Sequence, residues 1–293
     1  MKSPFTGKEM ILVKEWREMT YRKEKFQVLF HSYRCEDTGE QFEDESQAIL
    51  NYNQFINQYR VAHRIPFPEQ IKSIREKYNL SAAKMSEVLG MGPNTWASYE
   101  SGEVPSKVHA NLIQMISDTA SFRKYVESYC ELEEKERSKI LKKLENLPTD
   151  GCHCNDLLSR FEKQPDITTG FKPFDKEKVK QIVLFFAENQ QPFKTKMNKL
   201  LWYTDNYQFK NTAQSISGMS YRAIPYGPVP EHYEVLFDVL QEMEIIDKDW
   251  TLTENGPIER IIPAQNQKFN SSIFTPSELK TLEYIAEKFK NTS

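Results

Sequence analysis

The sequence has 293 residues, which is enough for two ordinary domains or three small ones. Charged residues make up 28% and hydrophobic residues 39%, as in a soluble globular protein, and the formal net charge of −3 gives no overall attraction to nucleic acid. The longest apolar run, residues 182–187, is too short to span a bilayer, and no apolar signal segment follows Met1, so we expect a cytoplasmic protein without membrane contact.

The first segment, residues 1–60, is predicted to contain short strands followed by a helix. Residues 10–13 and 26–30 are apolar and β-prone, which indicates strands. Residues 44–59 show helical periodicity instead. The inward positions of that helix would be Ile49, Tyr52, Phe55, Ile56 and Tyr59.

Two matching turns bracket the predicted strands. They read Ser-Pro-Phe-Thr-Gly from Ser3 and Cys-Glu-Asp-Thr-Gly from Cys35. This is the spacing of two zinc knuckles, in which C-x-x-C-G turns aim paired thiolates at one metal. The four ligand positions here hold Ser3, Thr6, Cys35 and Thr38. A hydroxyl is a poor zinc ligand and one thiol cannot hold a structural site, so we predict a zinc-ribbon-like β unit without metal.

The second segment, residues 61–130, is predicted to be a helix-turn-helix bundle. It begins after two prolines, and the sequence Gly-Met-Gly at 90–92 supplies the turn. We expect Ser81 to be the N-cap of one helix and Pro93 to occupy the first position of the next. The predicted helices are residues 69–78, 82–89, 93–99 and 111–116.

The helix at 93–99 would be the recognition helix, whose exposed side chains reach base edges in the major groove. The residues predicted to contact DNA are Asn94, Thr95 and Ser98 at the bases, and Lys84 and Lys107 at the phosphates. We expect Trp96 and Tyr99 to lie in the core. Residues 63–117 hold six basic and five acidic side chains, a net of +1, so the module would bind DNA weakly as a monomer. The alternative is a helix-turn-helix kept only as a scaffold or dimerisation unit.

The third segment, residues 131–173, is predicted to contain a charge-rich helix, which starts at residue 129 and ends near 147, and a linker. Cys152, His153 and Cys154 offer three metal-binding side chains in the linker, but tetrahedral zinc normally takes spaced pairs from two turns. Cys130 could join them only if the intervening helix folded back. We therefore interpret this stretch as a solvated linker and expect no metal or cofactor. Four cysteines are too few for a disulfide framework.

The last segment, residues 174–293, is predicted to be a helical α+β domain, so the whole chain is expected to be mainly α with small β elements. Asp175 should cap its first helix. Further helices are expected at residues 196–209, 231–243 and 277–290, and short strands at 250–252 and 258–262.

Aromatic residues and prolines are dense between residues 196 and 233. The helix carries one stripe of Met197, Leu200, Leu201, Thr204 and Gln208 and a second of Leu200, Tyr203 and Tyr207, although a surface helix needs only one. Residues 221–230 hold three prolines and one glycine, so this loop should be stiff and unable to join a central strand. An aromatic helix beside a stiff loop fits a preorganised protein-binding surface, and the plain alternative is the core of a small helical domain. The predicted contact residues are Lys199, Trp202, Tyr203, Asp205, Tyr221, Tyr226, Gly227 and Pro228.

Asp205 and His232 could in principle form an acid–base pair. No nucleophile, phosphate-binding loop or set of metal ligands accompanies them in the sequence. A structural hydrogen bond is the simpler interpretation, and we do not expect an enzyme.

Two stretches resemble known families. KLLWYTDNYQF followed by SGMSYRAIPYGPVP resembles the Panacea, or SocA-like, domain over residues 174–262. LSAAKMSEVLGMGPNTWASYESGEVPS is similar to the lambda-repressor-like module of MqsA-type antitoxins, whose N-terminal region binds zinc. Members of these families are antitoxins that bind and neutralise a growth-arresting toxin.

The resemblance implies a cognate toxin protein and operator DNA as partners, with a homodimer or a hetero-oligomer with toxin both open. The alternative is a helix-turn-helix transcriptional regulator whose C-terminal domain binds a different protein or ligand. The sequence does not discriminate between unrelated toxins.

Overall fold

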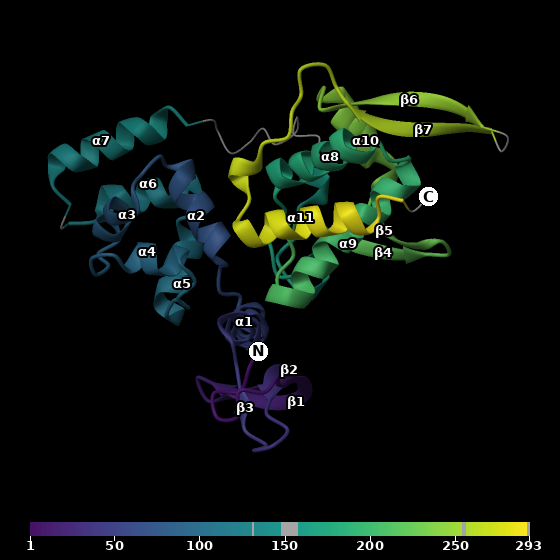
Figure 1. Ribbon diagram of the computed structural model, residues 1–293. Coiled ribbons are helices and arrows are strands. Elements are labelled where there is room, and N and C mark those ends of the chain that lie inside the picture. Colours follow the sequence, from purple (N-terminus) through teal and green to yellow (C-terminus); the bar gives the residue numbers. More distant parts are fainter. Residues whose placement is uncertain (131, 148–157, 254–255, 292–293) are drawn as a thin grey trace. The chain divides into compact units, whose positions relative to one another are not determined.

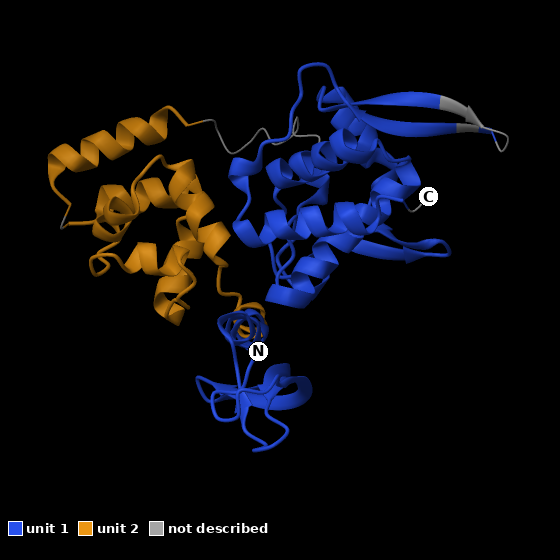
Figure 2. Ribbon diagram, in the orientation of Figure 1, with its two compact units in different colours: residues 1–57, 157–293 blue, residues 58–156 orange. Residues whose placement is uncertain are grey.

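The computed structural model describes residues 1–130, 132–147, 158–253 and 256–291 (Figure 1). The fold is mainly α with small antiparallel sheets, as the sequence predicts. The chain forms two compact units, one of residues 1–57 with 157–293 and the other of residues 58–156 (Figure 2). The predicted linker residues Cys152, His153 and Cys154 lie outside the described residues. No described helix is long and apolar enough to cross a membrane.

The first unit begins with a β-hairpin of β1 (Ile11–Tyr21) and β2 (Glu24–Arg34), and the short β3 (Gln41–Phe42) pairs with the end of β2. Both long strands extend well beyond the predicted residues 10–13 and 26–30. Exposed residues alternate with half-buried ones along β1, and charged residues stand on both faces, with Lys14 and Glu18 exposed and Glu15 and Arg17 half-buried. The prediction counted only the apolar runs and missed this alternation.

The two knuckle-like turns meet at Cys35. The Thr6 hydroxyl lies 3.6 Å from the Cys35 Sγ. Hydrogen bonds from the hydroxyls of Ser3 and Thr38 lower the pKa of the Cys35 thiol to about 6. The four positions therefore gather as zinc knuckles would, but one thiol and three hydroxyls do not fit a structural zinc ion. Among the described residues, no group of three or more His, Cys, Asp or Glu side chains could hold a metal.

Helix α1 (Glu45–Ala62) is joined to the hairpin by side-chain amides. Asn51 accepts the N–H of His31 at 2.9 Å and donates to its carbonyl at 2.8 Å. Gln54 forms the same pair of bonds with Leu29, both at 2.9 Å. These amides satisfy backbone groups of β2 at residues that β3 does not pair.

Two more amides of α1 reach the end of α9 (Lys194–Thr212). Asn53 Nδ2 donates to the Thr212 carbonyl and Asn57 Nδ2 to the Ala213 carbonyl, each at 2.9 Å. The last carbonyls of a helix have no partner within the helix, so these bonds stabilise the C-terminus of α9.

The apolar face predicted for α1 is only partly correct. Phe55, Ile56 and Tyr59 are buried as expected, but Ile49 and Tyr52 are exposed. The amide residues occupy inward positions in their place, because they have backbone partners on β2 and α9.

The rest of the first unit surrounds one hydrophobic core. Apolar residues of its helices and of the β6–β7 hairpin form a single cluster around Phe186 and Phe237. Asp175 caps α8 as predicted, accepting the N–H of Lys178 at 3.0 Å. The elements, in chain order, are η2 (Ser159–Phe161), η3 (Ile167–Thr169), α8 (Lys176–Gln190), α9, β4 (Tyr221–Ile224), β5 (Gly227–Pro230), α10 (Tyr233–Glu242), β6 (Ile246–Thr253), β7 (Gly256–Pro263), η4 (Ser271–Ile273) and α11 (Pro276–Lys288).

The second unit is a bundle of α2 (Pro68–Lys77), α3 (Ala82–Val88), α4 (Thr95–Glu100), α5 (Lys107–Met115), α6 (Thr119–Ser128) and α7 (Glu134–Glu145). Ser81 caps α3, as predicted. The prediction for this unit was wrong in three respects. The helix α4 begins after residue 93 because Asn94 has a left-handed backbone with a φ of 64°. Ser106 caps α5, so that helix begins earlier than residue 111, and α6, which Asp118 caps, was missed.

Because the four knuckle positions already converge, three substitutions should create a zinc site. We expect the Ser3→Cys, Thr6→Cys, Thr38→Cys variant to purify with about one zinc ion per chain, since four thiolates are a complete structural ligand set. Elemental analysis of the purified protein measures this.

The control adds Cys35→Ser to the triple variant and should hold clearly less zinc. A folded triple variant that takes up no zinc would contradict the convergence of these four positions.

Candidate functional site

The helix α9 buries the stripe that the sequence predicts. Its five residues are each at most 6% exposed, so this face belongs to the core. They are Met197, Leu200, Leu201, Thr204 and Gln208.

The second stripe of α9 packs on α11 through stacked rings. Tyr203 stacks on Phe289 and Tyr207 on Tyr284, each with ring centroids 4.4 Å apart. Trp202 is half-buried and meets the Tyr203 ring edge-on at 4.9 Å. Part of the aromatic density therefore serves the domain's own packing, while Tyr203 keeps 37% of its surface exposed.

The prediction of a loop at residues 221–230 was wrong in one respect, because these residues form the hairpin β4–β5. Ile224 pairs with Gly227, which leaves Pro225 and Tyr226 as a two-residue turn. The hairpin is a separate two-stranded sheet among the described strands, consistent with prolines that cannot donate to a neighbouring strand. Tyr226 at the turn is 90% exposed.

Lys199 fastens the hairpin to α9. Its Nζ donates to the Pro228 carbonyl at 2.9 Å. A Cβ placed on Gly227 would lie 2.9 Å from the same nitrogen, and the φ of Gly227 is 105°. Both facts favour glycine at this position.

Asp205 holds the chain that leads from α9 into β4. It is only 3% exposed, and its carboxylate accepts the N–H groups of Ile216 at 2.8 Å and of Ser217 at 2.9 Å. It also accepts the Ser217 hydroxyl and, at 2.6 Å, the Tyr221 hydroxyl. Burial raises the pKa of Asp205, and these hydrogen bonds oppose that rise. The carboxylate therefore has a structural role.

The predicted pairing of Asp205 with His232 is not formed. Among the described residues, the donors to this carboxylate are Ile216, Ser217 and Tyr221. His232 is the N-cap residue that precedes α10 and has a φ of 57°, and its ring lies edge-on to Phe161 at 6.0 Å. This arrangement supports no acid–base chemistry between the two residues.

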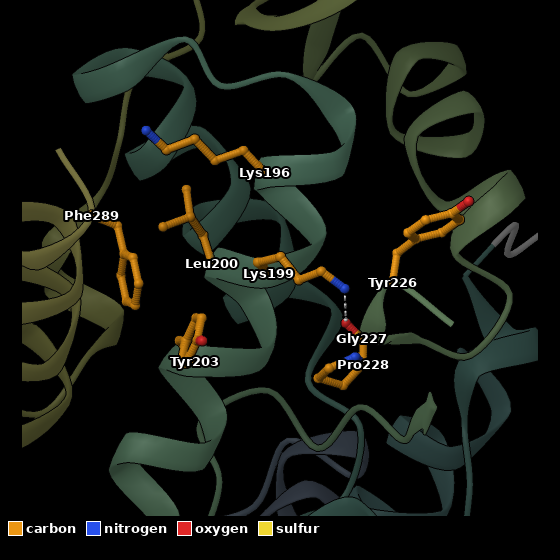
Figure 3. Close-up of a pocket in the computed structure, with 8 residues that line it drawn as sticks. All are labelled: Lys196, Lys199, Leu200, Tyr203, Tyr226, Gly227, Pro228 and Phe289. Carbon is orange, nitrogen blue, oxygen red and sulfur yellow. Dashed lines mark hydrogen bonds between the residues drawn. The ribbon is translucent and has the colours of Figure 1, made fainter. Parts of the chain in front are cut away.

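A pocket of about 310 Å³ lies between α9, the β4–β5 hairpin and α11 (Figure 3). Two lysine side chains enter it among apolar and aromatic groups, and burial lowers the pKa of both amines. No carboxylate is among the described residues that line it, so the pocket combines positive charge with apolar walls. The lining residues are Lys196, Lys199, Leu200, Tyr203, Tyr226, Gly227, Pro228 and Phe289.

In the second unit, α3 and α4 form the predicted helix-turn-helix, and Trp96 and Tyr99 are buried in its core as expected. An ion pair fixes α4 to α2: Arg75 Nε donates to Glu100 at 2.6 Å, and the Trp96 indole N–H donates to the same carboxylate at 2.7 Å. Side-chain hydrogen bonding to this carboxylate raises the pKa of Arg75.

The residues predicted to contact DNA differ in their availability. Asn94 and Lys107 are exposed, and Thr95 and Ser98 are half-buried. Lys84 instead lies 2.8 Å from Glu87 and 3.3 Å from Glu136, which compete with a phosphate for its charge.

Comparison with known families places both halves of the chain. Residues 197–293 match the family model described as antitoxin SocA-like, Panacea domain. Residues 1–144 match the model described as the antitoxin component of bacterial toxin–antitoxin system, MqsA. The two matches agree with the architecture that the sequence predicts, an MqsA-like region followed by a Panacea-like domain, and the name Panacea domain is used below for the matched residues 197–293. No curated protein matches the chain.

Within the Panacea domain, the structure brings together five of the predicted contact residues around the pocket: Lys199, Tyr203, Tyr226, Gly227 and Pro228. Trp202 adjoins them through its contact with Tyr203. Asp205 is buried and Tyr221 donates to it, so both support the surface from within.

Three lining residues were not among the predicted contact residues: Leu200, which belongs to the buried stripe of α9, Lys196 and Phe289. Lys196 lies one turn before Lys199 on α9, and helical spacing alone could have found it. Phe289 follows α11 and approaches α9 only through the tertiary fold, so no local pattern marks it.

We expect Asp205→Ala to destabilise the Panacea domain by about 3 kcal/mol or more, because it leaves several buried donors without an acceptor. Asp205→Asn keeps one acceptor oxygen and should cost less. Urea denaturation followed by circular dichroism measures both. Asn206→Ala, on the exposed side of the same helix, is the control and should change stability little. An Asp205→Ala protein as stable as the wild type would refute the structural role.

Proposed function

We propose that this chain is an antitoxin that neutralises a cognate toxin by direct contact through its Panacea domain. The proposed docking surface consists of Lys196, Lys199, Tyr203, Tyr226 and Phe289 around the pocket. The observation that carries the proposal is Tyr226, 90% exposed on a hairpin that Lys199 ties to α9.

An aromatic side chain on an ordered backbone is a favourable anchor for a protein partner. Tyrosine contributes a large contact area and loses little conformational entropy when its backbone is already ordered. Tyr226 occupies a two-residue turn next to a proline, so its backbone is already ordered and loses little conformational entropy on binding. The exposure of this large side chain therefore favours a role in a protein interface over that of an ordinary solvent-exposed residue in a turn.

The charge of the docking surface indicates the chemistry of the partner. Lys196 and Lys199 enter the pocket without a lining carboxylate, so an acidic group of the toxin would find complementary charge there. We therefore propose that an acidic side chain or the carboxyl terminus of the toxin enters the pocket while Tyr226 packs on its surface.

The double variant Lys196→Ala, Tyr226→Ala should lose the ability to rescue growth when the toxin is co-expressed. The loss of one anchor and one charge contact should weaken toxin binding by about 30-fold or more. Growth rescue and calorimetry with the purified toxin measure the two effects.

Its control is Trp250→Ala, Lys268→Ala, which removes one exposed aromatic residue and one exposed lysine elsewhere in the same unit. The control should rescue growth like the wild type. Full rescue by the Lys196→Ala, Tyr226→Ala protein would move the toxin-binding surface to another part of the chain.

We further propose that the helix-turn-helix binds the operator of the antitoxin's own operon. Asn94 supports this role, because it is exposed at the start of α4 and makes no capping bond to the described residues. An asparagine amide can pair bidentately with adenine. Lys107 is exposed at the start of α5 and can neutralise a phosphate.

Asn94→Ala with Lys107→Ala should weaken binding to the upstream DNA by about tenfold or more at fixed salt, with toxin rescue unchanged. Fluorescence anisotropy with labelled DNA measures the affinity. Lys135→Ala, an exposed lysine of α7, serves as the charge control. Unchanged DNA affinity in the double variant would exclude α4 as the recognition helix.

A further inference from the structure

A second and larger cavity lies in the first unit, away from the docking surface. Its volume is about 620 Å³, within the range of small-molecule sites. Its walls come from the β1–β2 hairpin, the first turn of α1, the last turn of α9 and the first turns of α11.

Three lysines from three different elements line this cavity. They are Lys14 of β1, Lys210 of α9 and Lys280 of α11. All three are exposed, and none pairs with a carboxylate among the described residues, whereas many other lysines of the chain do. No aspartate or glutamate is among the described residues that line the cavity. Like charges gathered without counter-charges favour the binding of an anion.

The starts of two helices add to the positive charge. Ser46 in the first turn of α1 and Ser277 in the first turn of α11 both line the cavity. Backbone N–H groups and the helix dipole make such termini suited to phosphate. Of the acidic residues close in sequence, Glu278 pairs with Lys178 at 2.6 Å and Asp44 accepts from Ser46 at 2.7 Å, while Glu45 is exposed and does not line the cavity.

A buried histidine supplies a different kind of contact. His31 is 8% exposed, and its Nδ1 lies 2.8 Å from the Leu29 carbonyl, to which it donates. Its Nε2 is then left as an acceptor, and the residue lines the cavity. Burial, together with the charges of Lys14 and Lys210, lowers the pKa of His31 and so favours this neutral form.

The remaining wall is apolar and aromatic. Leu12 and Tyr33 face each other across the hairpin, as do Lys14 and His31, so one face of the sheet presents both kinds of group. Tyr207 adds a ring from α9. A ligand for this cavity needs concentrated negative charge, a hydroxyl or amino donor and a ring-sized apolar part.

We propose that this cavity is a binding site for a nucleotide, with the phosphates at Lys14, Lys210 and Lys280. A phosphate chain concentrates several negative charges within a short length, whereas an acidic peptide carries one on each side chain. The sugar hydroxyls or base amino groups would donate to His31, and the base would lie against the apolar wall. The site joins the N-terminal sheet to the Panacea core and is separate from the toxin-docking pocket.

The test titrates the full-length chain with ATP, inorganic tripolyphosphate and adenosine in a calorimeter at low salt. We expect ATP to bind, tripolyphosphate to bind about tenfold more weakly or worse, and adenosine to give no measurable heat. Lys210→Gln with Lys280→Gln should weaken ATP binding by about tenfold or more, because two of the three phosphate contacts are lost.

The matched control is Lys135→Gln with Lys268→Gln, which removes the same charge from exposed lysines outside the cavity and should leave ATP binding within about twofold. Absence of ATP binding to the wild type, or equal weakening by the control pair, would overturn the proposal. Tripolyphosphate binding as tightly as ATP would reduce the site to one for phosphate alone. Tighter binding of a glutamate-rich peptide than of ATP would assign the cavity to an acidic protein segment.

Discussion

The Panacea domain depends on one buried carboxylate. Asp205 gathers two backbone N–H groups and two hydroxyls from the segment that follows α9, and so fixes where β4 begins. This anchor also positions Tyr226. The hairpin that carries Tyr226 at its turn begins at Tyr221, and the Tyr221 hydroxyl is one of the four donors. Burying an ionised carboxylate alone costs free energy. Four hydrogen-bond donors offset that cost, and they also fix the geometry of the segment.

Side-chain amides of α1 likewise fix backbone segments of the first unit by hydrogen bonds. Asn51 and Gln54 complete the backbone pairing of β2, while Asn53 and Asn57 complete the end of α9. A single helix therefore ties the N-terminal sheet to the Panacea core through hydrogen bonds whose partners are backbone groups. Apolar contacts alone would not fix the register between these elements as strictly.

Much of this fold could be predicted from local patterns. The caps at Ser81 and Asp175, the buried stripe of α9 and the core positions of Trp96 and Tyr99 follow from spacing and side-chain chemistry that act within a few residues. The proline-rich segment was predicted to be stiff, but its pairing into a hairpin depends on the register of two short strands, which composition does not give.

The candidate sites were harder to predict than the fold. Lys199, Tyr203 and Tyr226 were found because they lie in one dense stretch, yet Phe289 reaches the same pocket from far along the chain. Asp205 was interpreted as a surface contact because sequence alone does not distinguish a buried carboxylate from an exposed one. The larger cavity is lined by residues of the β1–β2 hairpin, α1, α9 and α11, so no single stretch of sequence indicates it.

The turns around Cys35 carry a consequence for folding in the cell. Where a structural metal closes a small β unit, folding waits for the cation, and chelators reverse it. Here Ser3, Thr6 and Thr38 are attached to the chain from the moment of synthesis and converge on the sulfur without competing for a scarce ion. We therefore expect the N-terminal hairpin to assemble at a rate independent of the supply of trace elements.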